Sequence, residues 1–414
     1  MGAINLDNTG SGGAVTLSSD GTNLLLGGSA VGGGADLYAA NESSPSAQPS
    51  ATGANAVALG ESSTASGTNS FAFGTLSVAS GDSSFAAGYD AVSSGDQSFS
   101  FGDNVNATGS FSFCTGGGDA TASGIGSIAM GYAARASNTN AVAIGRNTDA
   151  THSGSAAIGY DAQAANTQAI ALGDSRASGN NSFAVAIDNN TSSYGATGSG
   201  AIAIGDRNQT SGNYSVNLGR LNVVSGSNGA AAIGQNSTAT ADSAIAMGEV
   251  ARATAEQSFA VGRWAYTGST YGKFAKANGG FASFGDSQNG WYNLRSDTTD
   301  ATAEAMTTNN ATAAANNQIV VASDSCMTFS GTIVAMQNGA QAYGSWKIEG
   351  LLVNDGGTTT VPNSAITVIH NSSSWGLALS ADNTNNALAV TVTGEASHNI
   401  RWVANIQTAE VNYA

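Results

Sequence analysis

The side chains that most often carry catalysis or bind metal ions are few in this chain and far apart. Its 414 residues include three histidines, His152, His370 and His398, and two cysteines, Cys114 and Cys326. No known catalytic motif pairs a serine or cysteine nucleophile with one of these histidines, and this set cannot form a Cys/His zinc cluster or a disulfide framework. We expect solvated or structural histidines and two cysteines buried as small hydrophobic residues.

The glycine-rich runs do not fit a phosphate or calcium site either. The run Gly268-Ser-Thr-Tyr-Gly272-Lys273-Phe274 has too few residues between its glycines for a phosphate loop, and Asp382-Asn-Thr-Asn-Asn-Ala387 lacks the glycine and distal glutamate of a calcium loop. We therefore predict no catalytic residue, no cofactor and no metal site. A pair of carboxylates from neighbouring coils or chains would leave no sequence signature, so glycan cleavage is kept as an alternative.

The composition restricts the class of protein further. The chain has 55 glycines, 3 prolines, only 10% charged residues and a net charge of −16. This charge is opposite in sign to that of a phosphate-binding surface, so we predict no nucleic-acid partner. The N-terminus has no basic segment followed by a long apolar run, and we expect neither a signal peptide nor membrane insertion.

A short motif, apolar-Ala-apolar-Gly, recurs along the chain, mostly every 14 residues. Typical copies are Val57-Ala-Leu-Gly60, Val142-Ala-Ile-Gly145 and Ile245-Ala-Met-Gly248. A coiled coil needs strong helix formers and few glycines, whereas every unit here contains Gly, Ser, Asn or Thr at its edges. The alternation of large and small residues instead predicts a short strand, and the glycine predicts a corner with positive φ.

We predict that the residues three and one before each glycine point inward, and that the glycines form the corners of the repeat. The predicted inward row includes Val57, Leu59, Phe71, Phe73, Ile128, Met130, Val142, Ile144, Ile170, Leu172, Ile202, Ile204, Ile245 and Met247. The predicted corners are Gly60, Gly74, Gly88, Gly102, Gly131, Gly145, Gly159, Gly173, Gly205, Gly219, Gly234, Gly248 and Gly262.

A second, weaker half-unit follows each corner, with a small residue such as Ala65 or Ala79 in the place of a second inward strand. Two short strands and two tight corners account for 14 residues. Stacking such coils predicts a parallel β-solenoid of about sixteen coils between residues 55 and 285, in which each coil pairs with the next.

The repeat resembles the head repeat of YadA-like trimeric autotransporter adhesins. The Ser-Val-Ala-Ile-Gly motif of that family is matched here by Ala141-Val-Ala-Ile-Gly145 and by Gly200-Ala-Ile-Ala-Ile-Gly205. The resemblance covers residues 55–262, the predicted shaft. It implies a left-handed parallel β-roll in which three chains pack side by side as an obligate trimer.

The segments that flank the shaft differ from it in composition. Residues 1–54 contain two short apolar runs, which predict a small β-hairpin or adaptor and a linker that attach the chain to a virion; a disordered tail is the alternative. Residues 263–285 contain six aromatic residues, and we expect these rings to cap the last coil rather than to bind a ligand.

Residues 286–414 alternate in hydrophobicity like half-buried antiparallel strands, for example at Leu388, Val390 and Val392. We predict an antiparallel β-sandwich of jelly-roll type. The stretches 375–382, 389–396 and 399–404 resemble the C-terminal domain of tailed-bacteriophage fibre and tail proteins. The candidate host-contact residues lie in the loops of this domain: Asp355, Thr359, Asn383 and Asn385.

Together these observations predict an all-β tail fibre of a bacteriophage. It would be made in the host cytoplasm and carried on the virion, where a homotrimer binds a host-cell surface glycan or protein without turnover. Its N-terminus would attach to a tail or baseplate protein. The alternatives are a glycan-cleaving fibre, a purely architectural spike of the head or tail, and a fragment of a bacterial trimeric adhesin.

Overall fold

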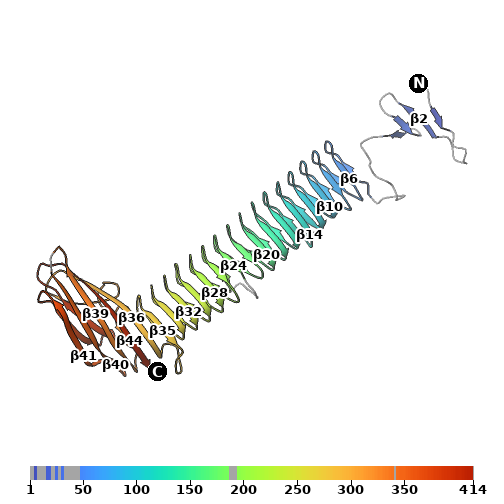
Figure 1. The fold of residues 1–414 in the computed structure, drawn as a ribbon. Coiled ribbons are helices and arrows are strands. Elements are labelled where there is room, and N and C mark those ends of the chain that lie inside the picture. Colours follow the sequence, from blue (N-terminus) through green and yellow to red (C-terminus); the bar gives the residue numbers. More distant parts are fainter. Residues whose placement is uncertain are drawn as a thin grey trace. The chain divides into compact units, whose positions relative to one another are not determined.

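A computed structural model describes residues 47–185, 194–339 and 342–413, together with four short N-terminal strands. Every regular element in these residues is a β-strand, which confirms the predicted all-β class (Figure 1). In the same residues, no helix is long and apolar enough to cross a bilayer. The chain comprises two compact units, Met1–Asp161 and Ala162–Ala414.

The N-terminal strands form a four-stranded antiparallel sheet in the order β1-β2-β3-β4, a longer meander than the predicted hairpin. Their bounds are Ile4–Leu6, Val15–Ser19, Leu24–Leu26 and Ser29–Val31. The predicted linker around Pro45 lies mostly outside the described residues. Nothing in this sheet tests the predicted attachment to a virion.

In the first unit, eight principal strands stack in parallel, one from each coil. Phe85 pairs with Phe71 on one side and with Phe99 on the other, so equivalent residues of successive coils are in register. The principal strands are β6 (Val57–Leu59), β8 (Phe71–Phe73), β10 (Phe85–Tyr89), β12 (Phe99–Asp103), β14 (Phe113–Gly117), β16 (Ile128–Tyr132), β18 (Val142–Arg146) and β20 (Ala156–Tyr160).

A second parallel ladder closes the other side of these coils. Its strands are β5 (Ser50–Ala51), β7 (Thr64–Ala65), β9 (Val78–Ala79), β11 (Val92–Ser93), β13 (Val105–Ala107), β15 (Ala120–Ala122), β17 (Arg135–Ala136) and β19 (Asp149–Ala150). Two ladders per coil are the arrangement that the weaker half-units predicted.

The second unit continues the same design through eight further coils. Its principal strands are β22 (Ile170–Leu172), β24 (Phe183–Val185), β26 (Ile202–Ile204), β28 (Val216–Arg220), β30 (Ala231–Gln235), β32 (Ile245–Glu249), β34 (Phe259–Arg263) and β35 (Phe274–Asn278). Its second ladder contains β21 (Gln163–Ala164), β23 (Arg176–Ala177), β25 (Gly195–Ala196), β27 (Gln209–Thr210), β29 (Val223–Val224), β31 (Thr238–Ala239) and β33 (Arg252–Ala253). The described strands thus confirm a parallel solenoid of about sixteen turns.

Alanine fills the narrow interior of the coils. From the second coil onward, the residue two before the repeat glycine is buried, as at Ala72, Ala143 and Ala246, and so are Ala65 and Ala79 of the second ladder. Cys114 replaces this alanine in one coil: it is fully buried, as predicted, and burial raises the pKa of its thiol to about 11. The interior is therefore only as wide as two small side chains.

Buried asparagines take the place of small residues such as Ser63 and Ala134 in part of the second unit, and they hydrogen-bond to the backbone. Asn208 Nδ2 donates to the carbonyl oxygens of Ile204 at 2.7 Å and of Gly219 at 2.8 Å. Asn222 repeats these bonds one coil later, and its backbone N–H donates to Asn208 Oδ1 at 3.1 Å. This asparagine ladder joins successive coils through their interior, where unpaired polar groups would be costly.

The predicted positive φ angles are confirmed at all thirteen predicted corner glycines, with values from +75° to +146°. In most coils, however, the glycine lies inside the principal strand, as Gly145 does in β18. The corners themselves are formed by left-handed residues further along, often asparagine or aspartate, such as Asn147 and Asp161.

The close stacking of the coils explains the glycines. A Cβ atom added to Gly145 would lie 1.7 Å from the carbonyl oxygen of Gly159 in the next coil. Equivalent contacts of about 2 Å recur along both units, for example between Gly88 and Gly102. These positions therefore need glycine both for conformation and for space.

The C-terminal domain, residues 286–413, continues the principal sheet of the second unit. β35 pairs in parallel with β34 and antiparallel with β36 (Ser287–Thr298), the first strand of the domain. The large sheet then runs β36-β44-β39-β40-β41. These strands are β39 (Ser325–Gln337), β40 (Tyr343–Asp355), β41 (Thr358–Asn371) and β44 (Ile400–Asn412).

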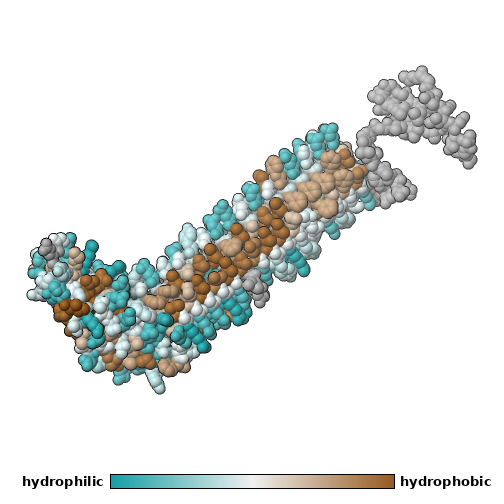
Figure 2. Space-filling model, in the orientation of Figure 1, coloured by the Kyte–Doolittle hydropathy of each residue, from teal (hydrophilic) through white to brown (hydrophobic). Residues whose placement is uncertain are grey.

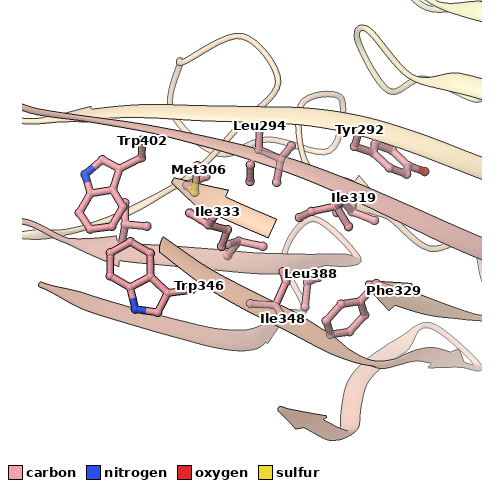
Figure 3. Close-up of a cluster of buried hydrophobic side chains, with 14 of the residues drawn as sticks. Tyr292, Leu294, Met306, Ile319, Phe329, Ile333, Trp346, Ile348, Leu388 and Trp402 are labelled. Atoms are coloured by element: carbon pink, nitrogen blue, oxygen red, sulfur yellow. The ribbon is translucent and has the colours of Figure 1, made fainter. Parts of the chain in front are cut away.

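A smaller antiparallel sheet packs against the large one and encloses the main hydrophobic core. Its central strand β43 (Ala387–Thr393) pairs with β42 (Gly376–Asp382), β37 (Ala303–Ala305) and β38 (Ile319–Val320). Trp346 and Trp402 stack in the core with ring centroids 5.4 Å apart (Figure 3). This arrangement confirms the predicted antiparallel domain, and the burial of Trp346, Trp375 and Trp402 matches the alternation in the sequence.

The glycine positions give a direct test of coil stacking. We expect Gly145→Ala to destabilise the first unit strongly, since the strained φ of +131° alone costs on the order of 1–3 kcal/mol and the Cβ collides with the next coil. Gly117→Ala is the matched control, because a Cβ there meets nothing closer than 3.4 Å. Thermal unfolding followed by circular dichroism measures both; equal midpoints would contradict the stacking described here.

Candidate functional site

Large apolar side chains line one outer face of the coils. Phe71, Phe101 and Ile158 in the first unit and Val216 and Leu218 in the second have exposed fractions between 38% and 56%. Figure 2 shows apolar side chains gathered along the coils of each unit. We call this surface the coil face and define it as the residues three and one before each repeat glycine.

The predicted inward row is therefore wrong, because these residues form the coil face instead. Phe71, Met130, Ile170, Ile245 and Met247 are exposed. The other members are half-buried on the same face: Val57, Leu59, Phe73, Ile128, Val142, Ile144, Leu172, Ile202 and Ile204. The fully buried residue is the alanine between them, because the interior between the two ladders has room only for small side chains.

Aromatic rings stack from coil to coil on the coil face. In the first unit, Phe85 and Phe99 have ring centroids 4.8 Å apart, and Phe99 and Phe113 are 5.1 Å apart. In the second unit, Phe274 lies between Phe259 at 5.0 Å and Trp291 at 4.8 Å. The coil face thus continues without interruption from the last coils onto the C-terminal domain.

A buried ion pair joins the last coil to the C-terminal domain. Lys273 Nζ lies 2.7 Å from Glu410 Oε2, and both side chains are less than a tenth exposed. The same carboxylate accepts hydrogen bonds from Gln288 Nε2 at 2.7 Å and from Tyr292 Oη at 3.1 Å. Gln288 in turn bonds both the backbone N–H and the carbonyl of Tyr266.

The protonation of this cluster follows from its surroundings. Burial by itself would raise the pKa of Glu410, but the charge of Lys273 and the bonds from Lys273, Thr408 and Gln288 outweigh it and hold the pKa below its usual value. Burial, together with the charge of Glu410, raises the pKa of Tyr292 well above its usual value. The Glu410 carboxyl is therefore ionised and the Tyr292 phenol neutral at neutral pH.

A loop whose backbone is bonded to a single carboxylate carries Phe281 beside this junction. Asp286 accepts hydrogen bonds from the backbone N–H groups of Phe281, Ala282 and Ser283, and these bonds outweigh the effect of burial and lower the pKa of its carboxyl. Phe281 is 80% exposed and borders a cavity of about 710 Å³. The aromatic residues of segment 263–285 thus include both packed rings, such as Phe274, and an exposed one.

The candidate host-contact residues lie at the coil-proximal end of the C-terminal domain. Asn354 pairs with Ser325, which pairs with Asn412, next to the start of β36. The turns that contain Asp355 and Asn383 are held together by a bond from the Thr359 backbone N–H to Asn383 Oδ1 at 2.7 Å. The structure therefore brings the four predicted residues together, but near the coils.

Thr359 is not a surface residue, which contradicts its prediction as a host contact. It is 1% exposed and lies in β41, because the connection from β40 is a tight turn at Gly356 and Gly357 rather than a long loop. Asp355 and Asn383 are exposed, while Asn385 is half-buried and donates to Asp382 at 2.7 Å.

The opposite, distal end carries features that the sequence analysis missed. A cavity of about 630 Å³ there is bordered by Val334, Met336, Asn399, Arg401 and Val403. Val334 is 54% exposed, Val403 45% and Met336 63%. Alternation in the sequence identifies the buried residues of these strands as core. It does not distinguish Val334, Met336 and Val403 from other outward-facing residues.

The residues considered for chemistry lie apart from one another. His152 Nδ1 is 3.0 Å from Thr151 Oγ1, His370 stacks on Tyr343, and His398 Nδ1 is 3.5 Å from Glu395. Cys326 is half-buried rather than buried, because it points to the outer side of β39. Within the part of the chain that the structure describes, no three acidic, histidine or cysteine side chains are grouped as metal ligands.

Comparison with known proteins supports the solenoid. The family model described as "YadA head domain repeat (2 copies)" matches seven segments: residues 51–77, 79–104, 122–148, 153–175, 196–220, 227–249 and 239–263. These segments coincide with the stacked coils, but together they cover less than half of the chain. The coils are thus a YadA-like β-roll. No curated protein matches the chain.

Among solved structures, the chain is similar to the crystal structure of the Acinetobacter baumannii phage AM24 tailspike protein. The two share 10% sequence identity, the match covers 89% of this chain and 76% of that one, and the TM-score is 0.18. At this score the two folds do not superpose as wholes, so the match carries no argument about function.

The buried pair at the junction predicts a defined dependence of stability on pH. A carboxyl whose pKa is lower in the folded than in the unfolded state stabilises the protein fully at any pH above its unfolded-state pKa, here about 4.5. This contribution is lost as the pH falls through the folded-state pKa. We expect Glu410→Gln to lower stability at neutral pH by about 3–5 kcal/mol, because it leaves Lys273 buried and unpaired.

The measurement is the unfolding midpoint as a function of pH. The unsubstituted protein should lose stability on acidification below the usual carboxyl range, and Glu410→Gln should lose less. Glu349→Gln is the control, because its partner Lys347 and Glu349 itself are more than half exposed. A Glu410→Gln profile parallel to that of the unsubstituted protein would show that the pair does not govern the acid sensitivity.

Proposed function

We propose that this chain forms a homotrimeric β-roll fibre whose three copies pack through the coil face. The observation that carries the proposal is the position of the large apolar side chains, which lie outside the alanine-filled coils in both units. A contiguous apolar surface of this extent is typical of an interface rather than of a monomer's surface. The number three rests on the resemblance of the repeat to YadA-like trimeric proteins.

The energetics favour assembly through this surface. Each coil contributes up to two large side chains, and complete burial of one such side chain contributes about 1.5–3 kcal/mol. The coil interior, filled with alanine, adds little hydrophobic stabilisation by comparison. We infer that association, rather than the interior of each coil, supplies most of the hydrophobic stabilisation of the shaft.

Within this proposal the trimer is a bacteriophage tail fibre that recognises the host-cell surface. The N-terminal sheet would attach to a tail or baseplate protein, and the β-roll would hold the C-terminal domains away from the virion. Binding would involve a surface glycan or protein without turnover, and three copies would provide avidity. The resemblance of the C-terminal sequence to phage fibre domains supports this setting over a bacterial adhesin.

The proposed interface can be tested by separating association from folding. Ile144→Asp places a charge on the coil face and should reduce the trimer to smaller species, whereas Ala143→Asp buries a charge inside the coil and should unfold it. Ser137→Asp, at an exposed position, should change neither. Light scattering gives the mass and circular dichroism the fold; a folded monomer of the unsubstituted chain would overturn the proposal.

Host recognition requires a separate experiment. Fluorescently labelled full-length trimer should bind candidate host cells and compete with virions for adsorption, while host polysaccharide incubated with it should release no new reducing ends. Ile144→Asp should compete far more weakly, because avidity is lost with the trimer. Release of sugar would instead favour the glycan-cleaving fibre, and a trimer that neither binds nor competes would favour an architectural spike.

A further inference from the structure

The C-terminal domain exposes a second apolar surface at its distal end. We define the distal patch as Val334, Met336, Tyr343 and Val403, which are 45% to 63% exposed. They are contiguous, because Val334 pairs with Val403 and Met336 with Tyr343 across neighbouring strands. The Tyr343 ring also stacks on His370 at 5.0 Å, which extends the patch to the edge strand β41.

The distal patch lies on the same sheet face as the coil face. Trp291, the last ring of the Phe259–Phe274–Trp291 stack, lies opposite Gln407 of β44. Side chains alternate along a strand, so Val403, which lies four residues before Gln407 in β44, points to the same side. The apolar coil face and the distal patch are therefore two parts of one side of a continuous sheet.

The edge next to the patch is also uncovered. β41 bonds to β40 along one edge, and residues 362–370 are exposed throughout, including Ile366, Val368 and Ile369. Ile366 and Val368 lie opposite the core residues Ile348 and Trp346, so the core side of the sheet opens to solvent at this strand. Exposed apolar edge strands promote uncontrolled pairing unless something covers them.

The charges around these surfaces suit contact between identical chains. Residues 356–381 contain no aspartate, glutamate, lysine or arginine, although the chain carries a net charge of −16. Near the patch, Arg401 is paired with Asp297 at 3.6 Å and Lys347 with Glu349 at 3.1 Å, whereas the exposed Arg295 lies directly opposite Val403. Acidic groups are therefore sparse here, and two copies can meet with less repulsion than the net charge of the chain would cause elsewhere.

We propose that the distal patch is covered by a second copy of this chain, so that the trimer is held together at its C-terminal end as well as along the coils. This inference rests on the proposed trimer. It follows from the shared sheet face, because chains that pack through the coil face bring the same face of their C-terminal sheets toward one another. The patch is then an intersubunit contact and not a host-binding surface.

Cysteine cross-linking of the full-length chain tests the inference. The background is Cys114→Ala, which restores the usual alanine, together with Cys326→Ser. Val403→Cys reports on the distal patch, Ile144→Cys on the coil face, and Asn383→Cys on an exposed turn at the other end of the domain. A short bismaleimide should link Val403→Cys chains about tenfold more than Asn383→Cys chains, since thiols within one assembly have effective concentrations in the millimolar range.

The three cysteine positions test the distal contact separately from the proposed coil-face trimer. Cross-linking at both 144 and 403 supports both. Cross-linking at 144 alone, with position 403 no better than 383, overturns the distal contact and leaves the trimer in place. Cross-linking at 403 alone supports the distal contact and overturns the coil-face interface, and cross-linking at neither position overturns both.

Discussion

The spacing between stacked coils is the constraint on which the rest of the structure depends. Successive glycines lie so close that a single added carbon would occupy the position of a carbonyl oxygen in the neighbouring coil, as at Gly145 and Gly159. The two ladders of a coil also lie close together, and the space between them is filled mostly by alanine and serine, with a few residues no larger than valine or a backbone-bonded asparagine. Large apolar residues are thereby displaced to the outside, where they become available to other chains.

The fold could be predicted from the sequence, but alternation alone could not predict which side of each principal strand is buried. Period-two alternation fixes that residues 142 and 144 share a side and that 143 takes the other, without saying which side is closed. The side-chain volumes at the two positions identify the buried side. The position of Ala143 is almost always small, whereas the position of Val142 holds anything from alanine to phenylalanine. A sealed interior does not tolerate such variation, so the uniform position is the buried one.

The site residues were harder to predict for a related reason. Turn-forming sequences at Asp355 and Asn383 identify loops, but which end of a sandwich a loop occupies depends on strand pairing, and the pairing of β36 with β35 and β44 has no local signature. Lys273 and Glu410 likewise look like ordinary surface charges in the sequence. Their burial results from a contact between residues separated by most of the C-terminal domain.

The coil that separates Phe183 from its partner Ile202 is longer than its neighbours, yet the pairing on either side of it is undisturbed. Because each coil contacts only the next ones, extra residues between two strands leave the described strands of both ladders in register. A β-roll of this kind can therefore vary widely: its length can change by whole coils, and its surface by single corners, while the coil face is preserved. Lineages that carry such a β-roll can change what its corners display while its coil face stays the same.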